Sequence, residues 1–578
     1  MARRTLQAPG LGPDQKFSEC CDDPGRLDEL SAVLRAVFAI DLTSAELARE
    51  GTAAAVAERT ARGRPRTRGH DVEAGSAPRT GNATEASFGQ SGIWLIDQYL
   101  PTPEAYNGPF LVRLPFRLDG ERLRRSVAGV LRRQEVLRTT YTLRDARLLQ
   151  IVSDDDTAFH YRVEHYGGEK ELDAIAQRVA NIRFDLEHGP VTSVTCALGP
   201  GEESAIVCNI HHIASDAASA GVFLRELLDA YDRNGRGLPV EAVPGRPDYA
   251  DFAHWHREHL TPIRTAELLD EWADRLAGEL PVLDLPADRP RPAAQEHRGA
   301  TVPLRVPAEV TERLARLAER EGVTLFMALL AVYGVFLGKL TRQERVLIGS
   351  PVSLRDDAQT QDLIGYFVNM VVLRQDVTGS MSVREVLRQA REEVADALRL
   401  KWAPFDKVVE RLKPERNSAH TPVLQTMLVL TDPGSAQCVH EGTPLTVRRD
   451  MAHGAKYDLS VVFAREEDGL HGTLEYDSHL FDEATARSMS ERLGRLVGRF
   501  AAAGPDALVR DLGLLADGEE RDLLARNDLV DRSARPVPVG ELFERQVSAT
   551  PDAVAVTDGG RSWTYRELDE RANRLAHV

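Results

Sequence analysis

The sequence predicts an α+β fold built as more than one lobe, and three features lead to this prediction. Residues 204–210 (SAIVCNI) form a continuous apolar run that is typical of a buried strand. Residues 121–134 are instead predicted to form an amphipathic helix, because Leu123, Val127 and Val130 recur at helical spacing on one face. This mixed pattern continues over about 430 residues, which is long for a single hydrophobic core. We therefore expect two lobes that contain both sheets and helices.

The other predicted elements rest on the same periodicities. Helices are expected as short segments within residues 27–60, in the stretch AGVFLRELLDAYDRN after the first strand, and at residues 308–321 and 324–340. Strands are expected at residues 345–352 (RVLIGSPV) and 363–374 (LIGYFVNMVVLR). Because these elements do not alternate as a regular βαβ repeat, the pattern favours α+β lobes.

The composition narrows the class of protein. The chain has 578 residues and a formal net charge of −17, which argues against a general nucleic-acid-binding function. It contains five cysteines but no CxxC pair, so we expect no cysteine zinc site and a reducing compartment. No apolar segment follows the N-terminal basic residues, and no run of about 18 apolar residues occurs, so neither a secretory signal nor a membrane span is expected. The sequence thus predicts a cytoplasmic protein without a membrane or nucleic-acid partner.

The strongest local signal is the segment CNIHHIASDAAS at residues 208–219. A buried strand runs into His211 and His212, and Asp216 follows at a position typical of a helix N-cap. The motif alone leaves three interpretations open. It could be a structural pair of histidines with a capping aspartate, a metal site with only three local ligands, or a site where one histidine performs acid–base or positioning chemistry.

Seven segments in chain order resemble the core motifs of nonribosomal peptide synthetase condensation domains. They are SFGQSGIWLIDQYLP (87–101), RRQEVLRTTY (132–141), CNIHHIASDAAS (208–219), DYADFAHW (248–255), IGYFVNMVVLR (364–374), APFDKVVERL (403–412) and RNSAHTPVLQTMLVL (416–430). The resemblance covers residues 87–515. It implies two chloramphenicol-acetyltransferase-like lobes in a V-shaped pseudo-dimer with a central tunnel, with the N-lobe at 87–260 and the C-lobe at 261–515.

The resemblance implies an acyltransferase that joins a donor acyl or peptidyl thioester to the amine of an acceptor aminoacyl thioester. Donor and acceptor peptidyl carrier domains would present both substrates on phosphopantetheine arms, so we expect no cofactor or metal on the chain itself. His212 would be the catalytic residue, because an imidazole with a pKa near 6.5 can accept the proton that leaves the amine or hold the amine by a hydrogen bond. The sequence leaves these two actions open. His211 is expected to pack against the loop and support it.

The resemblance also assigns supporting positions. Asp216 matches a structural aspartate and is expected to form a buried pair with Arg133, which would fix the geometry of the loop. Arg138 and Trp255 match other motif positions and are interpreted as residues that support the fold. Asn369 matches an asparagine near the tunnel, where we expect it to play a supporting polar part.

Several positions depart from the family pattern. Ala217 stands where the family has a glycine beside the reaction centre, and its methyl group could narrow the channel or be harmless if φ is negative. Gln134, Gly92 and Met370 replace a histidine, an arginine and a threonine. Ala217 and the truncated flanks keep open a catalytically silent domain that only docks carriers. An epimerisation-type relative shares the HHxxxD motif and is the other alternative, although the adenylation-like start after residue 540 argues against it.

Both ends of the chain carry further segments. Residues 1–60 are predicted to be a short helical segment and resemble part of a carrier domain, but Pro24 stands where the arm-bearing serine would fall, so a degenerate remnant and a plain helical leader both stay open. Residues 61–86 and 516–540 are expected to be linkers. Residues 541–578 resemble the truncated start of an adenylation domain, which would be a partner in the same module.

Overall fold

The computed structural model describes residues 52, 83–99, 103–240, 246–295, 297–415, 417, 419–431, 437–440, 442–449, 451, 454–527 and 537–577. Apart from Thr52 and residues 83–86, the segments expected at 1–60 and 61–86 lie outside these residues. Contacts divide the chain into two compact units, Met1–Leu514 and Leu515–Val578. Within its described residues, the first unit carries two large hydrophobic cores, each built on one large sheet, and a smaller core on the other face of one of these sheets. We call the two parts built on the sheets the first and second lobe.

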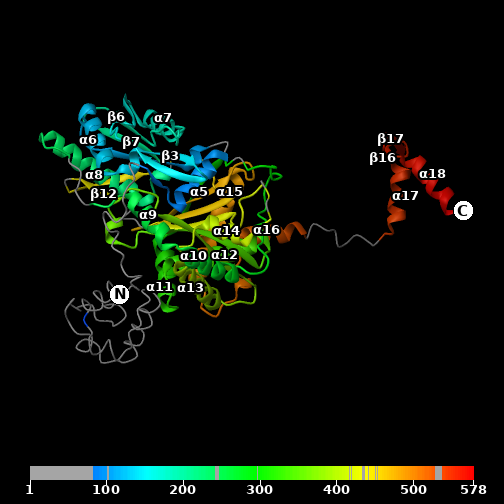
Figure 1. Ribbon diagram of the computed structural model, residues 1–578. Helices are drawn as coiled ribbons and strands as arrows, with labels where there is room; N and C mark the ends of the chain where they lie inside the picture. The colour runs from blue at the N-terminus through cyan, green and yellow to red at the C-terminus, as the bar shows by residue number, and fades with distance from the viewer. Residues whose placement is uncertain are drawn as a thin grey trace. The chain divides into compact units, whose positions relative to one another are not determined.

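In the described residues, the first lobe is built on a six-stranded sheet with the order β12-β13-β2-β7-β6-β5 (Figure 1). Its elements up to residue 259 are α5 (Phe88–Tyr99), β2 (Asn107–Leu114), α6 (Gly120–Arg133), β5 (His160–His165), α7 (Glu169–Ala180), β6 (Thr192–Leu198), β7 (Ser204–His211), α8 (Ala217–Gly235) and α9 (Tyr249–His259). Alternate residues of β7 pack with α6 and α8 on one face of the sheet and with α7 on the other. Because β7 is buried on both faces, most of its residues are apolar, and its polar Ser204, Asn209 and His211 are buried as well. The strand predicted at 204–210 is confirmed.

A small sheet completes the first lobe. It has the order β1-β4-β3 and consists of β1 (Ala83–Glu85), β3 (Thr139–Arg144) and β4 (Arg147–Val152). The strand β1 falls within the range predicted as a linker and pairs antiparallel with β4. Its three residues are too short a run for period-two alternation to be recognised in the sequence.

The second lobe has its own six-stranded sheet, with the order β10-β9-β11-β14-β15-β8 in the described residues. Its elements are α10 (Pro262–Arg275), β8 (Gly299–Pro307), α11 (Ala308–Arg320), α12 (Leu325–Thr341), β9 (Arg345–Ser353), β10 (Val368–Asp376), α13 (Val383–Arg399), α14 (Phe405–Leu412), β11 (Thr426–Thr431), β14 (Leu459–Glu466), β15 (Gly469–Asp477) and α15 (Glu483–Ala502). The prediction of an α+β fold with two sheet-containing lobes is therefore confirmed.

The helix α12 lies in the centre of the second core. It is buried from Met327 to Leu337, which explains why apolar residues surround it on every side. Within the described residues, no single helix has the length and apolar character that a bilayer span requires. Only α11 and α12 taken together meet that test, and they meet at a bend of 104°.

Two segments from the second half of the chain belong to the first lobe, which the division of the sequence at residue 260 did not anticipate. The hairpin of β12 (Gln437–His440) and β13 (Thr443–Arg448) extends the first sheet, with Arg448 in register with Leu111 of β2. The loop between β9 and β10 sends Leu363, Ile364 and Phe367 into the first core. We call residues 354–367 the crossing segment.

The crossing segment also corrects the predicted strand at 363–374. The strand begins at Val368 instead, and Leu363 to Phe367 are apolar because they pack against α9 and α8 rather than within the second sheet. Phe367 lies 4.6 Å from the ring of Phe252 and 4.9 Å from that of Tyr249, measured between centroids. An apolar run alone does not tell a strand from a segment buried in a neighbouring core.

Among its described residues, the second unit contains three helices and a hairpin. These are α16 (Asp517–Asn527), α17 (Val539–Ala549), β16 (Val554–Asp558), β17 (Arg561–Thr564) and α18 (Tyr565–Ala576). Helix α16 corrects the expectation of a linker at 516–540 for its own residues, since its polar composition hid a regular helix. The side-chain oxygen of Thr564 caps α18 by accepting a hydrogen bond from the backbone N–H of Glu567, as the sequence Thr-x-x-Glu favours.

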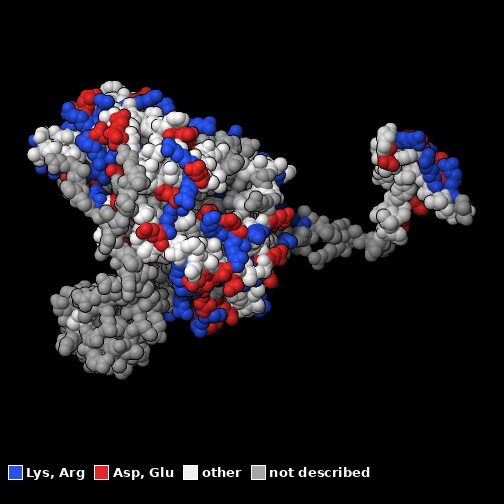
Figure 2. Space-filling model, in the orientation of Figure 1, with Lys and Arg blue, Asp and Glu red and all other residues white. Residues whose placement is uncertain are grey.

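The surface of the molecule carries both signs of charge. Figure 2 shows acidic and basic side chains interspersed over the visible face of the described residues. Many belong to exposed pairs one helical turn apart, such as Arg388 with Glu392 and Arg487 with Glu483. Each such pair contributes only about 0.3–0.5 kcal/mol, so the two cores rather than the surface determine the fold.

Phe367→Ala tests the crossing segment. Phe367 is fully buried among aromatic rings of the first lobe, so we expect its loss to cost about 3–5 kcal/mol of unfolding free energy. Ile263→Ala on α10 is the matched control, because Ile263 is 75% exposed and its loss should change stability by at most about 0.5 kcal/mol. Urea denaturation followed by tryptophan fluorescence would measure both, and equal midpoints for the two variants would contradict the packing role.

Candidate functional site

The two histidines lie at the end of a central strand of the first sheet. Strand β7 ends at His211, and a short 3₁₀ turn (η4, His212–Ala214) leads to Ser215 and the N-cap Asp216 of α8. The carboxylate of Asp216 accepts hydrogen bonds from the backbone N–H of Ser219 at 2.8 Å and from its hydroxyl at 2.7 Å. The loop between strand and helix is therefore short and fixed at both ends.

His212 lies in the wall of a cavity of about 190 Å³. Its Nδ1 is 3.3 Å from the carbonyl oxygen of Ser215, an acceptor that favours the tautomer with the proton on Nδ1. Burial, and then the charge of Lys456, hold the pKa of His212 well below its usual 6.5, although the Ser215 carbonyl acts in the opposite direction. The imidazole is thus neutral near pH 7, with a lone pair on Nε2 that can accept a proton.

His211 points into the core instead. Its Nδ1 accepts a hydrogen bond from the backbone N–H of Ile213 at 3.1 Å, which leaves the ring proton on Nε2, 3.6 Å from Asp97 Oδ1 of α5. The ring meets that of Phe184 edge to face. Burial lowers the pKa of His211. These contacts hold the ring in the core, and the supporting part expected of His211 stays a prediction.

Helix α5 supports the same turn. Gln90 donates a hydrogen bond to the carbonyl oxygen of Ile213 at 3.3 Å and another to the hydroxyl of Tyr141 at 2.9 Å. The Gln90 amide, the Tyr141 hydroxyl and the Ile213 carbonyl are all buried, so each of them finds within the protein the hydrogen-bond partner that water would otherwise supply.

Asp216 forms a buried ion pair, but its partner is Arg355 and not Arg133. Arg355 Nε and Nη2 each lie 3.0 Å from one oxygen of the carboxylate, and both side chains are at most 4% exposed. The predicted pair with Arg133 is wrong, because Arg133 at the end of α6 faces α8 further along that helix, where its Nη1 is 3.5 Å from Asp229. The planar guanidinium of Arg355 is suited to the two-point contact with the Asp216 carboxylate.

Arg355 belongs to the crossing segment and holds its two ends together. Its Nη1 donates to the carbonyl oxygens of Thr360 and Leu363, and its guanidinium lies over the ring of Phe367 at 4.1 Å. The backbone N–H of Phe367 donates in turn to Asp216 Oδ2 at 3.3 Å. The helix cap beside His212 and the crossing segment are thus one hydrogen-bonded unit.

Gln134 ties the same segment to α6. Its carbonyl oxygen accepts from the N–H of Ile364 at 3.0 Å, and its amide nitrogen donates to the carbonyl of Asp362 at 3.0 Å. Gln134 replaces a histidine of the family pattern, and this structure gives its amide both a donor and an acceptor partner. Arg138 donates to the carbonyls of Leu131 and Ser153, so it supports the end of α6 and the strand β4.

Asn369 and Trp255 lie around another loop, residues 401–405. Asn369 donates to the carbonyls of Lys401 and Ala403 and accepts from the N–H of Phe405, which satisfies its whole amide. The ring of Trp255 lies 5.4 Å from that of Trp402. Both residues therefore support the loop at residues 401–405, which lies beside β10 at the edge of the second sheet.

Ala217 is the first residue of α8 and lies in the wall of the His212 cavity. Its helical conformation has a negative φ, so a methyl group in place of the family glycine strains no backbone. Ala217 is exposed and lines the cavity, so its methyl group occupies space that a glycine would leave open.

Sequence reasoning missed several residues of this site. Gly108 of β2 lies opposite Ile210, and a Cβ there would meet the carbonyl oxygen of Ile210 at 2.9 Å and His212 Cε1 at 3.9 Å. A glycine inside a strand is a recognisable sign of such a close approach. Arg449 and Lys456, in contrast, reach the site from a loop more than two hundred residues away, and no local pattern indicates them.

The profile of the condensation-domain family matches residues 82–524, which is most of the chain. The chain belongs to this family. The resemblance inferred from the seven motifs is thereby confirmed.

Two known peptide synthases are similar to most of this chain. One protein of the linear gramicidin synthase of Brevibacillus parabrevis is 34% identical over 502 residues, or 85% of this chain and 10% of the relative. Phosphinothricin tripeptide synthetase PhsB of Streptomyces viridochromogenes is 35% identical over 540 residues, or 89% of this chain and 44% of the relative. The chain thus spans about a tenth to less than half of the length of these relatives.

Solved structures agree with this assignment of the fold. The crystal structure of the X-domain from teicoplanin biosynthesis superposes with a TM-score of 0.69 at 26% identity, and covers 77% of this chain and all of that one. The four-domain synthetase holo-AB3403 gives a TM-score of 0.67 at 22% identity over 86% of this chain and 39% of that one. The predicted lobes of the condensation-domain type are therefore confirmed.

The pair of Asp216 with Arg355 predicts a strong effect of its removal. Asp216→Ala leaves a buried guanidinium without its counter-charge, and we expect a loss of about 3–5 kcal/mol of unfolding free energy. Arg133→Gln is the control, since the pair of Arg133 with the half-exposed Asp229 contributes at most about 1 kcal/mol. Thermal denaturation of both variants and of Arg355→Ala measures the difference, and a larger loss in Arg133→Gln than in Arg355→Ala would contradict the assignment.

Proposed function

We propose that the chain forms an amide bond between a donor acyl thioester and the amine of an acceptor aminoacyl thioester. The observation that carries this proposal is His212, a neutral imidazole whose Nδ1 is held by the Ser215 carbonyl in the wall of a cavity. Amide formation is the general activity of the family to which the chain belongs. Donor and acceptor carrier domains bring both substrates on phosphopantetheine arms, as expected for relatives that are peptide synthetases.

The reaction needs one base, which lies beside the attacking amine. The free amine has a pKa near 8, so a fraction of its molecules is neutral near pH 7. A neutral amine attacks the thioester carbonyl, and a C–N bond forms. Nε2 of His212 accepts the proton that the nitrogen loses as the tetrahedral intermediate forms. The C–S bond then breaks, and the imidazolium returns the proton to the leaving thiolate. His212 ends neutral, so one histidine serves both proton transfers.

Lys456 assists burial, which is the larger cause, in keeping the pKa of His212 low and the imidazole in the neutral form that this mechanism needs. The ammonium lies 4.6 Å from the ring centroid of Tyr106, and its charge lowers the pKa of His212. Glu475 lies near Lys456, and burial raises the pKa of Glu475 to about 7 although Lys456 lowers it. This carboxyl is therefore partly protonated near neutral pH and offsets the Lys456 charge only in part.

We place the chain within a synthetase module. Residues 541–578, which lie in the second unit, are proposed to be the start of an adenylation domain that follows the condensation domain, as the sequence SWTYRELDERANRLA suggests. Carrier domains and this adenylation domain are the partners we propose. The segment 1–60, with Pro24 in place of the arm-bearing serine, stays a prediction outside the described residues.

A second candidate is a domain that binds partners without catalysis. The X-domain of teicoplanin biosynthesis, which is 26% identical, forms a complex with OxyB. Ala217 in place of glycine narrows the cavity at His212 and favours this candidate as well. Turnover decides between the two.

Reconstitution with His212→Ala tests the proposed reaction. Two carrier proteins loaded with alanyl-phosphopantetheine are mixed with the chain, and dipeptidyl carrier is measured by intact mass spectrometry. We expect product with the wild type and a drop of about 10²-fold or more in His212→Ala, the size typical of losing an acid–base group. His188→Ala is the control, because His188 is exposed and pairs with Asp185 at the surface.

The outcomes separate the two candidates. Wild-type rates in His212→Ala would remove the catalytic assignment of this residue. An absence of product over a broad donor and acceptor panel would favour the docking domain, and Ala217→Gly is then the first change to make.

The pH dependence tests the part of Lys456. A base must be neutral to act, so the rate falls as the pH drops through the pKa of His212, which is lowered in the wild type. Removing the Lys456 charge raises that pKa, so in Lys456→Met the acid limb of the kcat profile should move to higher pH. Lys456→Arg keeps the charge and should keep the wild-type limb. Protonation of the acceptor amine is common to all three proteins and cancels in the comparison, so identical profiles would contradict the role.

A further inference from the structure

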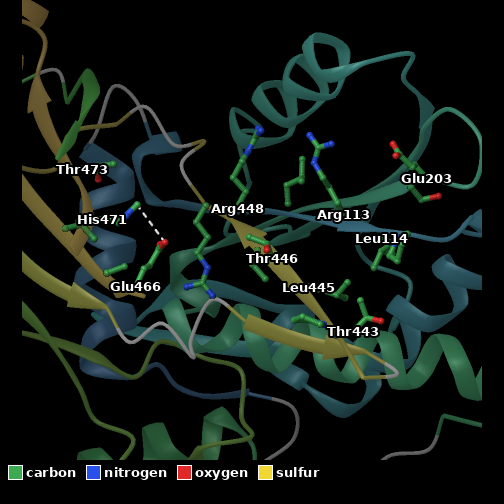
Figure 3. Close-up of a pocket in the computed structure, with 18 of the residues that line it drawn as sticks. Arg113, Leu114, Glu203, Thr443, Leu445, Thr446, Arg448, Glu466, His471 and Thr473 are labelled. Atoms are coloured by element: carbon green, nitrogen blue, oxygen red, sulfur yellow. Dashed lines mark ion pairs between the residues drawn. The ribbon is translucent and has the colours of Figure 1, made fainter. Parts of the chain in front are cut away.

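A large cavity between the two lobes continues toward Lys456. Its volume is about 860 Å³, and its walls include strands β2 and β13 of the first lobe and β14 and β15 of the second (Figure 3). His471 and Thr473 of β15 lie in this wall. Alternate residues of a strand point to the same side, so Glu475 continues the same face of β15. Burial raises the pKa of Glu475 and the charge of Lys456 lowers it, so the cavity wall leads to Lys456.

The arginines labelled in Figure 3 are paired within the protein. Arg448 Nη2 lies 2.7 Å from Asp173 of α7. Arg113 forms an ion pair with Glu169 of the same helix. Lys456 differs from both, because no residue that the structure describes forms a hydrogen bond or an ion pair with its ammonium. The three N–H donors of this ammonium are therefore available to a ligand.

An aromatic ring fixes the place of the ammonium. Lys456 Nζ lies 4.6 Å from the ring centroid of Tyr106, within the range of a cation–π contact. Tyr106 directly precedes β2, whose first residue Asn107 is the register partner of His211. Because β2 and β7 are antiparallel, the residue before Asn107 and the residue after His211 lie at the same end of the strand pair. The ammonium beside Tyr106 is thus held at the end of the sheet where His212 lies.

The backbone that carries Lys456 is anchored as well. A Cβ on Gly454 would meet the Cβ of Ala105 at 2.6 Å, so the chain approaches Ala105 as closely as only a glycine allows. The N–H of Ala455 donates a hydrogen bond to the carbonyl oxygen of His297 at 3.1 Å. A donor that is fixed in this way needs little reorganisation when charge develops beside it.

An ammonium in such a place needs an acceptor. Lys456 is half-buried, and burial lowers the pKa of its ammonium while the charge of Glu475 raises it. A partly desolvated cation without a hydrogen-bond acceptor costs free energy, and an oxygen of a bound substrate would remove that cost. The proposed reaction brings such an oxygen beside His212, because the carbonyl oxygen of the donor thioester becomes negative as the amine attacks. A fixed cation stabilises this oxygen more in the intermediate than in the thioester.

We propose that Lys456 is a further catalytic residue, whose ammonium donates a hydrogen bond to the oxyanion of the tetrahedral intermediate. The inference rests on the proposed amide-forming reaction and assigns the group that stabilises its intermediate. As the C–N bond forms, one electron pair of the C=O double bond moves to the oxygen, which the ammonium holds. When the C–S bond breaks, this pair returns and the C=O bond forms again. Lys456 keeps its proton throughout, and His212 carries out the proton transfers.

The experiment separates this role from the effect of Lys456 on the pKa of His212. Formation of dipeptidyl carrier from alanyl-loaded donor and acceptor carriers is measured with the full chain, as kcat and as KM for the donor carrier. All rates are compared on the plateau above the acid limb, where His212 is neutral in every protein and its pKa no longer limits the rate. The variants are Lys456→Met, Lys456→Gln and Lys456→Arg. Lys339→Met is the matched control, because Lys339 of α12 is also half-buried and burial lowers its pKa.

On this plateau we expect Lys456→Met to lower kcat by about 10²–10³-fold, the size of losing one oxyanion donor, with little change in KM. Lys456→Gln should lower kcat only about tenfold, because a neutral N–H still stabilises an oxyanion, although less than a cation does. Lys456→Arg keeps the charge and the donors and should retain more activity than Lys456→Met. Lys339→Met should match the wild type.

Three results would overturn the proposal, and thermal denaturation establishes which variants are folded. Wild-type kcat on the plateau in Lys456→Met, or in Lys456→Gln if the methionine variant does not fold, would mean that the ammonium acts only through the pKa of His212. A higher KM with unchanged kcat would mean that it binds the thioester and not the intermediate. Equal kcat values in folded Lys456→Gln and Lys456→Met would remove the hydrogen bond.

Absence of product from the wild type with every donor and acceptor pair is a different result. It contradicts the proposed reaction itself and removes the basis of this inference with it.

Discussion

The buried ion pair of Asp216 and Arg355 is the constraint on which the rest of the site depends. Moving the carboxylate and the guanidinium out of water costs several kcal/mol of free energy for each ion. This cost is offset only when every carboxylate oxygen and every guanidinium N–H finds a partner. Here the carboxylate accepts from Ser219, Phe367 and Arg355, and the guanidinium also binds two carbonyls of the crossing segment. The cap of α8, the loop of His212 and the docking of the crossing segment are therefore connected through one ion pair.

The position of His212 follows from that constraint. The histidine itself makes one hydrogen bond at 3.3 Å, which is weak support for a catalytic group. Its backbone, however, lies between the ordered strand β7 and the anchored cap of α8, so the ring has little freedom to leave the cavity. The chemistry needs a rigid frame more than it needs a strong contact to the imidazole.

Local patterns in the sequence were sufficient for the elements that bear the site, and insufficient for the contacts between them. The apolar run of β7 and the amphipathic face of α6 predict both elements within one residue of their ends. Asp216 and Arg355 are 139 residues apart, so no periodicity connects them, and the resemblance pointed to Arg133 instead. Leu363 to Phe367 were wrongly predicted to belong to a strand for the same reason, because an apolar run does not indicate which of the two cores buries it. Arg449 and Lys456 lie in a loop without a motif, and only folding brings them to His212.

The hairpin of β12 and β13 has a consequence for the order in which the chain is made. Strand β2 pairs with β7 on one side, but its other edge stays open until residues 437–448 are available to pair with it. A ribosome adds about 5–20 residues per second, so roughly 10–50 s pass between the synthesis of β7 and that of the hairpin. During that time the nascent first sheet exposes an unpaired edge, which is a site for association with other chains. The pairing of β2 with a hairpin made more than two hundred residues later thus lengthens the time in which the emerging polypeptide can associate with other chains.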